Sequence, residues 1–160
     1  MKSQLGIELS VGDIEIPLLP TIIVGKTATG KTRLLTKLIE QLQLMGVETV
    51  QYDKKISPYA ITQEIKIRNK GSKPVVVFVD DVCDIDSEIK QLLSLDAFER
   101  GIIGIVATQN KCILRGITSM AVNHIEMFNA VNELTHYTAL IGIPEDSCQY
   151  VHHYRKTCIN

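Results

Sequence analysis

Residues 25–32, Gly-Lys-Thr-Ala-Thr-Gly-Lys-Thr, constrain the fold more than any other stretch of the chain, because they fit the phosphate-loop pattern G-x-x-x-x-G-K-[ST]. Residues 21–24 before them form a β-branched run typical of a buried strand, and residues 33–44 after them carry apolar side chains at helical spacing. Strand, loop and helix in this order aim backbone N–H groups and a helix N-terminus at a phosphate chain. A chance match in a loop is the alternative, and both flanks disfavour it. The segment predicts a nucleotide site.

The residues of this loop have expected roles in holding the nucleotide. Lys31 is expected to neutralise the β- and γ-phosphates, and the Thr32 hydroxyl to bind Mg²⁺. Arg33 is expected to touch the nucleotide within its own chain or to pack on the surface. The expected nucleotide-binding residues are Gly25, Lys26, Thr27, Ala28, Thr29, Gly30, Lys31, Thr32 and Arg33.

Two carboxylates after an apolar run supply what a phosphate loop alone lacks. Hydrolysis of ATP needs a carboxylate near Mg²⁺ and a group that orients the attacking water. Residues 75–79 are apolar without alternation, which is typical of a central parallel strand, and Asp80 and Asp81 follow at its C-terminal end, where ligands bind in such sheets. We expect Asp80 to hold Mg²⁺ through its water shell, as a Walker B residue, and Asp81 to polarise the attacking water. Two solvated aspartates in a turn are the alternative.

Gln109 is a third candidate, because it follows another apolar strand, 102–107. Its amide can donate to the γ-phosphate and accept from water, so it can respond to the nucleotide state without a change in net charge. A strand-end residue that only satisfies backbone groups is the alternative interpretation.

The rest of the chain alternates between strand and helix patterns. This alternation predicts an α/β fold with a parallel sheet and right-handed crossovers, preceded by a short β-hairpin. The predicted hairpin covers 5–20, further strands are expected at 21–24, 47–52, 75–79, 102–107, 122–128 and 150–153, and helices at 33–44, 59–69, 85–99 and 133–141.

Composition is consistent with one soluble globular domain. The chain has 160 residues, 45% hydrophobic and 22% charged, so we expect lead-in strands over 1–20 and a single core over 21–160. The net charge of −1 provides no global basic field, so DNA binding would need a local patch or an oligomer. No signal peptide or membrane-length apolar run is present, and a cytoplasmic location is expected, in the host cytoplasm or with the virion if the protein is viral.

The cysteines are expected to be free thiols, because they show no C-x-x-C spacing. A zinc set made of Cys148, His152, His153 and Cys158 matches no strong ligand spacing and is disfavoured.

With these motifs in order, the chain resembles the motor domain of the FtsK/SpoIIIE family of DNA translocases, within the FtsK–HerA class that includes viral genome-packaging ATPases. The resemblance is collinear over nearly the whole chain and implies a RecA-like P-loop fold. The segments that carry it are the lead-in 5–12, the phosphate-loop approach 19–25, Tyr-Asp-Lys-Lys at 52–55, Val-Asp-Asp-Val at 79–82, the strand 101–109 ending in Ala-Thr-Gln, and Asn-His-Ile at 123–125.

Several positions depart from the family pattern. Thr21 replaces the usual histidine, Asp81 the usual glutamate and Asn110 the usual arginine after Ala-Thr-Gln. The stretch 53–75 is short, and we expect neither a membrane-spanning part nor a winged-helix domain. The departures point to a small stand-alone motor of a virus, phage or mobile element, used for genome packaging or DNA transfer.

The resemblance implies a homo-oligomeric ring, commonly a hexamer, that hydrolyses ATP at subunit boundaries and pulls double-stranded DNA through its centre. A neighbouring subunit usually supplies an arginine to such a site, and Arg100 and Arg115 are the better candidates here. Contact with DNA is expected to be non-specific and directed at phosphates. A docking partner in packaging or transfer machinery is a further expectation. The candidate DNA-contacting residues are Lys66, Arg68, Lys70 and Lys73, with Lys54, Lys55, Lys111 and Arg115.

Two other functions are alternatives to a motor. A nucleotide-dependent switch or assembly factor would bind ATP and change partners without moving DNA. A small kinase would need an arginine-rich lid towards the C-terminus, and residues 110–160 contain only Arg115 and Arg155, which disfavours it.

Overall fold

A central sheet of seven strands organises the molecule in a computed structural model that describes residues 6–26, 29–52, 58–83, 87–110, 122–129, 137–145 and 151–159. The elements are β1 (Glu8–Val11), β2 (Ile14–Pro17), β3 (Thr21–Val24), α1 (Lys31–Leu44), β4 (Glu48–Tyr52), α2 (Pro58–Ile67), β5 (Val75–Val82), α3 (Ser87–Leu92), α4 (Leu95–Glu99), β6 (Ile102–Thr108), β7 (Asn123–Asn129), β8 (Tyr137–Pro144) and β9 (His152–Ile159).

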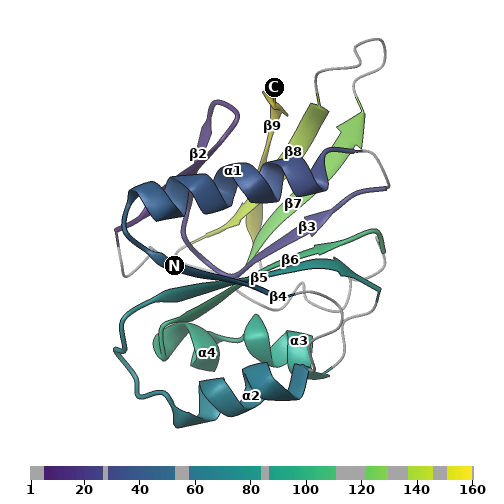
Figure 1. Cartoon of the computed structure of the whole chain (residues 1–160). Coiled ribbons are helices and arrows are strands. Elements are labelled where there is room, and N and C mark those ends of the chain that lie inside the picture. The colour runs from purple at the N-terminus through teal and green to yellow at the C-terminus, as the bar shows by residue number, and fades with distance from the viewer. Residues whose placement is uncertain are drawn as a thin grey trace.

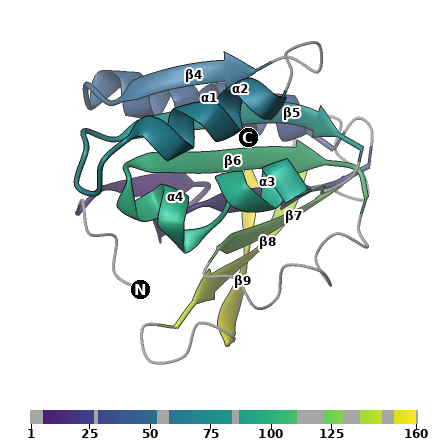
Figure 2. The same ribbon diagram turned by 90° about the horizontal axis from the view of Figure 1, so that it is seen from below.

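The strands of the central sheet follow the order β4-β5-β6-β3-β7-β8-β9, and a separate hairpin, β1-β2, precedes them. Helix α1 covers one face of the sheet, and α2, α3 and α4 lie on the other (Figure 1). Seen from below, these three helices lie in front of β5 and β6 (Figure 2). The sheet is therefore the middle layer of three.

The first five strands of this order, β4 to β7, are parallel. Thr21 of β3 pairs with Ile105 of β6 on one side and with Asn123 of β7 on the other. Every residue of β3 and β6 is buried, because helices and the hairpin leave neither face of these strands to solvent. The predicted α/β fold with a mostly parallel sheet and an N-terminal hairpin is therefore confirmed. Because these strands run parallel, their carboxyl ends all meet at one edge of the sheet.

The last strands make the sheet mixed, since β8 runs antiparallel to both β7 and β9. The predicted helix at 133–141 is wrong where the structure describes it, from residue 137 onwards. Residues 137–144 form β8 instead, and Ala139 and Ile141 are buried in it. A short apolar run cannot be assigned to helix or strand by periodicity, and here pairing on both sides satisfies its backbone.

Several element boundaries also differ from the sequence prediction, most of them by a few residues. The helix expected at 85–99 is divided into α3 and α4, because the Ser94 side chain accepts a hydrogen bond from the Ala97 amide at 3.1 Å and starts a second helix. The last strand begins at His152 and continues to Ile159, well beyond the predicted residue 153.

The core on the α1 face joins the hairpin to the sheet. Leu34, Leu38 and Leu42 of α1 pack in the same buried cluster as apolar residues of β1 and β2. Gln41 of α1 also receives a hydrogen bond from the Ser10 amide at 2.7 Å and donates one to the Ser10 carbonyl at 2.9 Å.

The expectation of a single domain over 1–160 stays a prediction. In the described part of the chain, no helix is both long and apolar enough to cross a membrane.

Candidate nucleotide-binding site

The phosphate loop follows β3 at the carboxyl edge of the sheet and leads into α1, in the order that the sequence predicts. Gly30 directly precedes the helix in a left-handed conformation, with φ of 82°. A Cβ atom on Gly30 would lie 2.8 Å from Cδ2 of Tyr137, so both the backbone and the neighbouring ring require glycine. Thr27 and Ala28 lie outside the described residues.

Gly25 connects this loop to the neighbouring strands. Its amide donates to the carbonyl of Thr108 in β6 at 3.1 Å. A Cβ atom at this position would lie 2.4 Å from Oγ1 of Thr29 and 3.0 Å from Cβ of Met127 in β7, so only glycine fits here. The first glycine of the pattern thus fixes the loop between β6 and β7.

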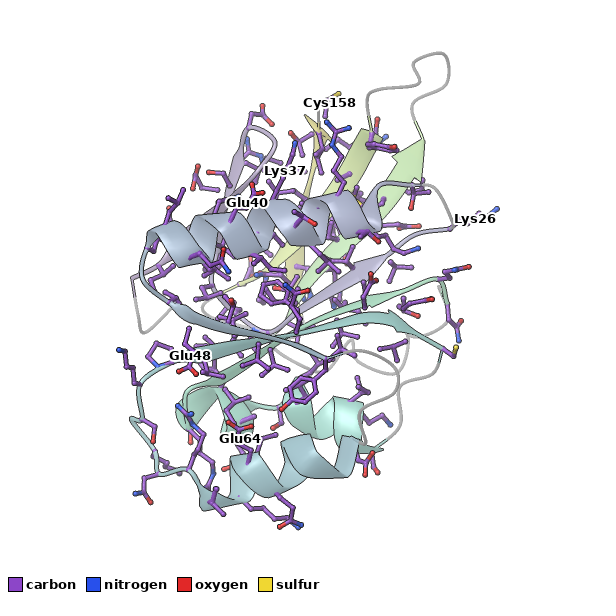
Figure 3. All side chains as sticks on the ribbon, in the orientation of Figure 1. Lys26, Lys37, Glu40, Glu48, Glu64 and Cys158 are labelled. Atoms are coloured by element: carbon purple, nitrogen blue, oxygen red, sulfur yellow. The ribbon has the colours of Figure 1, made fainter. Side chains whose placement is uncertain are left out.

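Lys31 is buried, and its side chain folds back into the loop. Its ammonium group donates to the carbonyls of Gly25 and Lys26, the second at 3.1 Å. Burial lowers the pKa of Lys31, while the charges of Asp80 and Asp81 act in the opposite direction. The Lys26 side chain instead points into solvent (Figure 3), so its backbone carbonyl is its contribution to the loop. A phosphate would compete with these carbonyls for the Lys31 ammonium.

Thr32 and Asp80 bring the helix and the β5 strand together. The Thr32 hydroxyl donates to Oδ2 of Asp80 at 3.2 Å. Strand β6 lies between β3 and β5, so the Asp80 carboxylate reaches the helix N-terminus across one intervening strand. Hydroxyl and carboxylate oxygens are ligands that Mg²⁺ prefers, and these residues therefore fit the predicted metal position.

A β-bulge explains how both aspartates reach the same place. Val79 pairs with Val106 and Val82 with Thr108, so β5 contains one more residue than β6 in this interval. Asp81 has φ of 57°, the one positive value among the described residues other than glycine. Neighbouring side chains in a regular strand point to opposite faces, and a bulge can redirect one of them. Both carboxylates consequently line one cavity.

That cavity has a volume of about 350 Å³ and lies at the carboxyl edge of the sheet. It contains the predicted lysine, both aspartates and Gln109, although their individual roles remain predictions. Tyr137 also lines it and was missed, because the sequence pattern assigned its segment to a helix. The lining residues are Thr29, Gly30, Lys31, Thr32, Arg33, Asp80, Asp81, Gln109 and Tyr137.

Arg100 lies outside the cavity, at the amino end of β6. Its guanidinium donates to the Arg68 carbonyl at 2.6 Å and to the carboxylate of Asp96 at 3.2 Å. Arg68 in turn donates to the Arg100 carbonyl at 3.1 Å and to that of Lys73. The two side chains thus connect the end of α2 to the segment before β6, within one chain.

The predicted DNA-contacting residues and the disfavoured zinc ligands do not line the cavity where the structure describes them. Lys70 forms an ion pair with Glu99 at 3.2 Å, also away from the cavity. Among the residues that the structure describes, no group of three or more His, Cys, Asp or Glu side chains could hold a metal ion. Four basic candidates, Lys54, Lys55, Lys111 and Arg115, lie outside the described residues, as does Cys148 of the disfavoured zinc set.

A second polar cluster lies on β7 and β9. The His124 ring is buried and stacks on His152, with 4.1 Å between ring centroids, and its Nδ1 lies 3.2 Å from the Tyr154 hydroxyl. Gly142 of the intervening β8 leaves room for Tyr154, since a Cβ there would lie 2.5 Å from its ring. Burial and His152 lower the pKa of His124 to about 4. This cluster holds β9 against the sheet.

Comparison with known proteins supports the fold. No protein-family model matches the chain, and no curated protein matches it. The N-terminal domain of zonular occludens toxin from Neisseria meningitidis is 16% identical with a TM-score of 0.53, over 89% of this chain and 95% of that one. The genome packaging NTPase B204 from Sulfolobus turreted icosahedral virus 2, in complex with AMP, is 10% identical with a TM-score of 0.58, over 88% and 97%. A further solved structure, of an ATPase domain, is 11% identical with a TM-score of 0.56, over 88% and 80%.

At these identities the likeness is one of fold. Together with the phosphate loop at the carboxyl edge of a mixed sheet, it establishes the fold of this chain as that of the RecA-like P-loop NTPases.

Proposed function

We propose that this protein is an ATP-hydrolysing motor that moves double-stranded DNA, of the FtsK–HerA type. The observation that carries the proposal is the single cavity in which Lys31, Thr32, Asp80, Asp81 and Gln109 converge. A cradle for phosphates, oxygen ligands for a cation, a second carboxylate and an amide are the groups that ATP hydrolysis requires.

The residues of the cavity divide this chemistry between them. Lys31 turns from the loop carbonyls to the β- and γ-phosphates, and Thr32 and Asp80 are the residues that would hold Mg²⁺. Held there, the cation would neutralise negative charge on the phosphates. Asp81 accepts a hydrogen bond from the attacking water and orients it towards the γ-phosphate. Gln109 contacts the γ-phosphate and responds to its loss.

Action on DNA is supported by the family resemblance and by the kinds of protein that share the fold. One structural neighbour is named as a viral genome packaging NTPase, and another, with a TM-score of 0.55 and 10% identity, as a DnaB-like replicative helicase. We assign the motor to genome packaging or DNA transfer in a virus, phage or mobile element, as the family resemblance implies. Its DNA contacts are phosphate-directed and draw on Lys66, Arg68, Lys70 and Lys73, with Lys54, Lys55, Lys111 and Arg115.

The proposed active form is a ring, commonly a hexamer, with ATP at the subunit boundaries. Arg115 is favoured over Arg100 as the arginine supplied by a neighbouring subunit, because the Arg100 guanidinium is already engaged by Asp96 and the Arg68 carbonyl.

The oligomeric state tests this proposal. The protein is mixed with a non-hydrolysable ATP analogue and duplex DNA, and its mass and shape are measured by light scattering and electron microscopy. Rings that form with nucleotide and DNA, and fail to form with Lys31→Ala, are the expected result. A protein that binds ATP and stays monomeric under every condition would point instead to a switch or assembly factor that does not translocate DNA.

A further inference from the structure

Tyr137 is the aromatic residue of the cavity and has no role in the chemistry proposed above. It is the first residue of β8, and one side of its ring lies against Gly30 at the start of α1. The ring is partly buried, and the rest of its surface lines the cavity. Within the described part of the chain, its hydroxyl has no hydrogen-bond partner.

Strand order gives the cavity two different ends. From β3, which carries the phosphate loop, the sheet continues through β6 to β5 on one side and through β7 to β8 on the other. Asp80 and Asp81 therefore lie at the β5 end, and Tyr137 lies at the β8 end. Because β8 runs antiparallel to β7, its first residue returns to the same carboxyl edge as the phosphate loop.

This arrangement orients an extended ligand. The terminal phosphate must face Asp80, which would bind the cation, and Asp81, which orients the attacking water, and both residues lie at the β5 end. The other end of the ligand therefore points towards β8. An aromatic ring offers a flat apolar surface, which suits a nucleobase and is indifferent to which base it is, since every base has a π-face.

We propose that Tyr137 is a specificity-determining residue against which the base of the bound nucleoside triphosphate stacks, so that the site selects nucleotides over bare triphosphate without selecting one base strongly. The proposal rests on the nucleotide site proposed above. It assigns the β8 end of the cavity to the base, as the β5 end is assigned to the γ-phosphate.

A structural role for Tyr137 makes a different prediction. If the ring only supports the loop through Gly30, its loss should weaken every ligand of the loop, including inorganic tripolyphosphate. If the ring contacts the base, its loss should weaken only ligands that carry a base. The two roles can therefore be distinguished by comparing, for the same variant, the binding of ligands with and without a base.

The binding test uses Mg²⁺ with ATP, GTP or inorganic tripolyphosphate, measured by calorimetry on the full chain. Tyr137→Leu should weaken ATP and GTP about fivefold to tenfold and leave tripolyphosphate unchanged, and Tyr137→Phe should bind all three as the wild type does. Phe128→Leu is the matched control, because Phe128 is a part-exposed aromatic on neighbouring β7 that does not line the cavity.

A second variant keeps the test decisive if the leucine variant does not fold. The chain contains no tryptophan, so Tyr137→Trp introduces a single fluorescent reporter. ATP and GTP should quench it, and tripolyphosphate should not. Equal weakening of all three ligands by Tyr137→Leu, no weakening of any, or equal quenching by tripolyphosphate would overturn the proposal. A wild-type protein that binds none of the three ligands would overturn the nucleotide site itself. If Lys31→Ala loses ATP binding but Tyr137→Leu binds ATP as the wild type does, only the role of Tyr137 would be overturned.

Discussion

The hydroxyl of Thr32 lies 3.2 Å from the carboxylate of Asp80, although 48 residues separate them in the chain. One residue belongs to the first turn of α1, and the other lies near the end of β5, with β6 between their strands. Contact between the two elements thus creates an oxygen pair at the edge of the sheet where ligands bind.

Asp80→Asn should preserve the fold and reduce Mg²⁺-dependent hydrolysis. The amide oxygen can still accept from Thr32, but it lacks the charge that orders the water shell of the cation, so we expect a loss of about 10- to 100-fold in activity or Mg²⁺ affinity. ATPase assays across a Mg²⁺ titration measure this loss. Thr36→Val is the control, because Thr36 is exposed one turn further along α1. Undiminished hydrolysis at low Mg²⁺ would remove Asp80 from the metal site.

Substitutions at position 81 should show that both the left-handed backbone conformation and the negative charge of the side chain matter. Asp81→Asn tolerates the left-handed backbone, so it should fold and bind ATP while hydrolysis falls about 10²- to 10⁴-fold. Asp81→Val is strained at φ of 57° and should lower the free energy of unfolding by about 1–2 kcal/mol. Thermal unfolding and single-turnover hydrolysis distinguish the two effects. A valine variant as stable as the wild type would contradict the strained bulge.

Arg100→Ala should affect stability more than catalysis. It removes the hydrogen bond to the Arg68 carbonyl, and we expect the free energy of unfolding to fall by about 1 kcal/mol. Denaturant unfolding measures this change, with Lys90→Ala as control, since Lys90 is exposed on α3. A variant of undiminished stability whose ATP hydrolysis is lost only in the assembled ring would instead identify Arg100 as the arginine supplied to the neighbouring site.

His124 should make the fold sensitive to acid. Its pKa is lowered to about 4 in the folded chain from the ordinary value of 6.5, so the unfolded chain binds the proton more readily. The contribution of the neutral His124 ring to the free energy of unfolding is therefore complete above pH 6.5 and declines as the pH falls towards 4. Below pH 4 the contribution no longer changes with pH. The decline attributable to this residue should be about 2–3 kcal/mol.

Unfolding by denaturant at pH values of about 7, 5.5 and 4 measures this decline, with His124→Phe as the comparison. The phenylalanine variant should lose less stability than the wild type over this interval. Parallel pH profiles for the two proteins would show that His124 does not titrate differently on folding.

The elements that carry the site were predictable where the signal was local. Thr21–Val24 and Val75–Val79 are runs rich in β-branched residues. They end at a phosphate loop and at two carboxylates respectively, and each pattern lies within a few neighbouring residues. The convergence of these strand ends follows from parallel pairing, which alternating strands and helices already indicate.

Features that depend on long-range pairing could not be predicted in the same way. The bulge that turns Asp81 into the cavity exists only through the register between β5 and β6. Tyr137 reaches the phosphate loop only because β8 pairs antiparallel with β7, in a segment whose short apolar run also fits a helix. Arg100 is close in sequence to the strand that leads to Gln109, yet it lies at that strand's other end.

The rate of ATP hydrolysis with and without duplex DNA tests the central proposal most directly. The full chain is assayed over a range of DNA concentrations and at increasing salt, with Lys31→Ala as the inactive control. Duplex DNA should raise the rate, and salt should abolish the increase, because the contacts are made to phosphates. An active ATPase whose rate is the same with every DNA tested would contradict it.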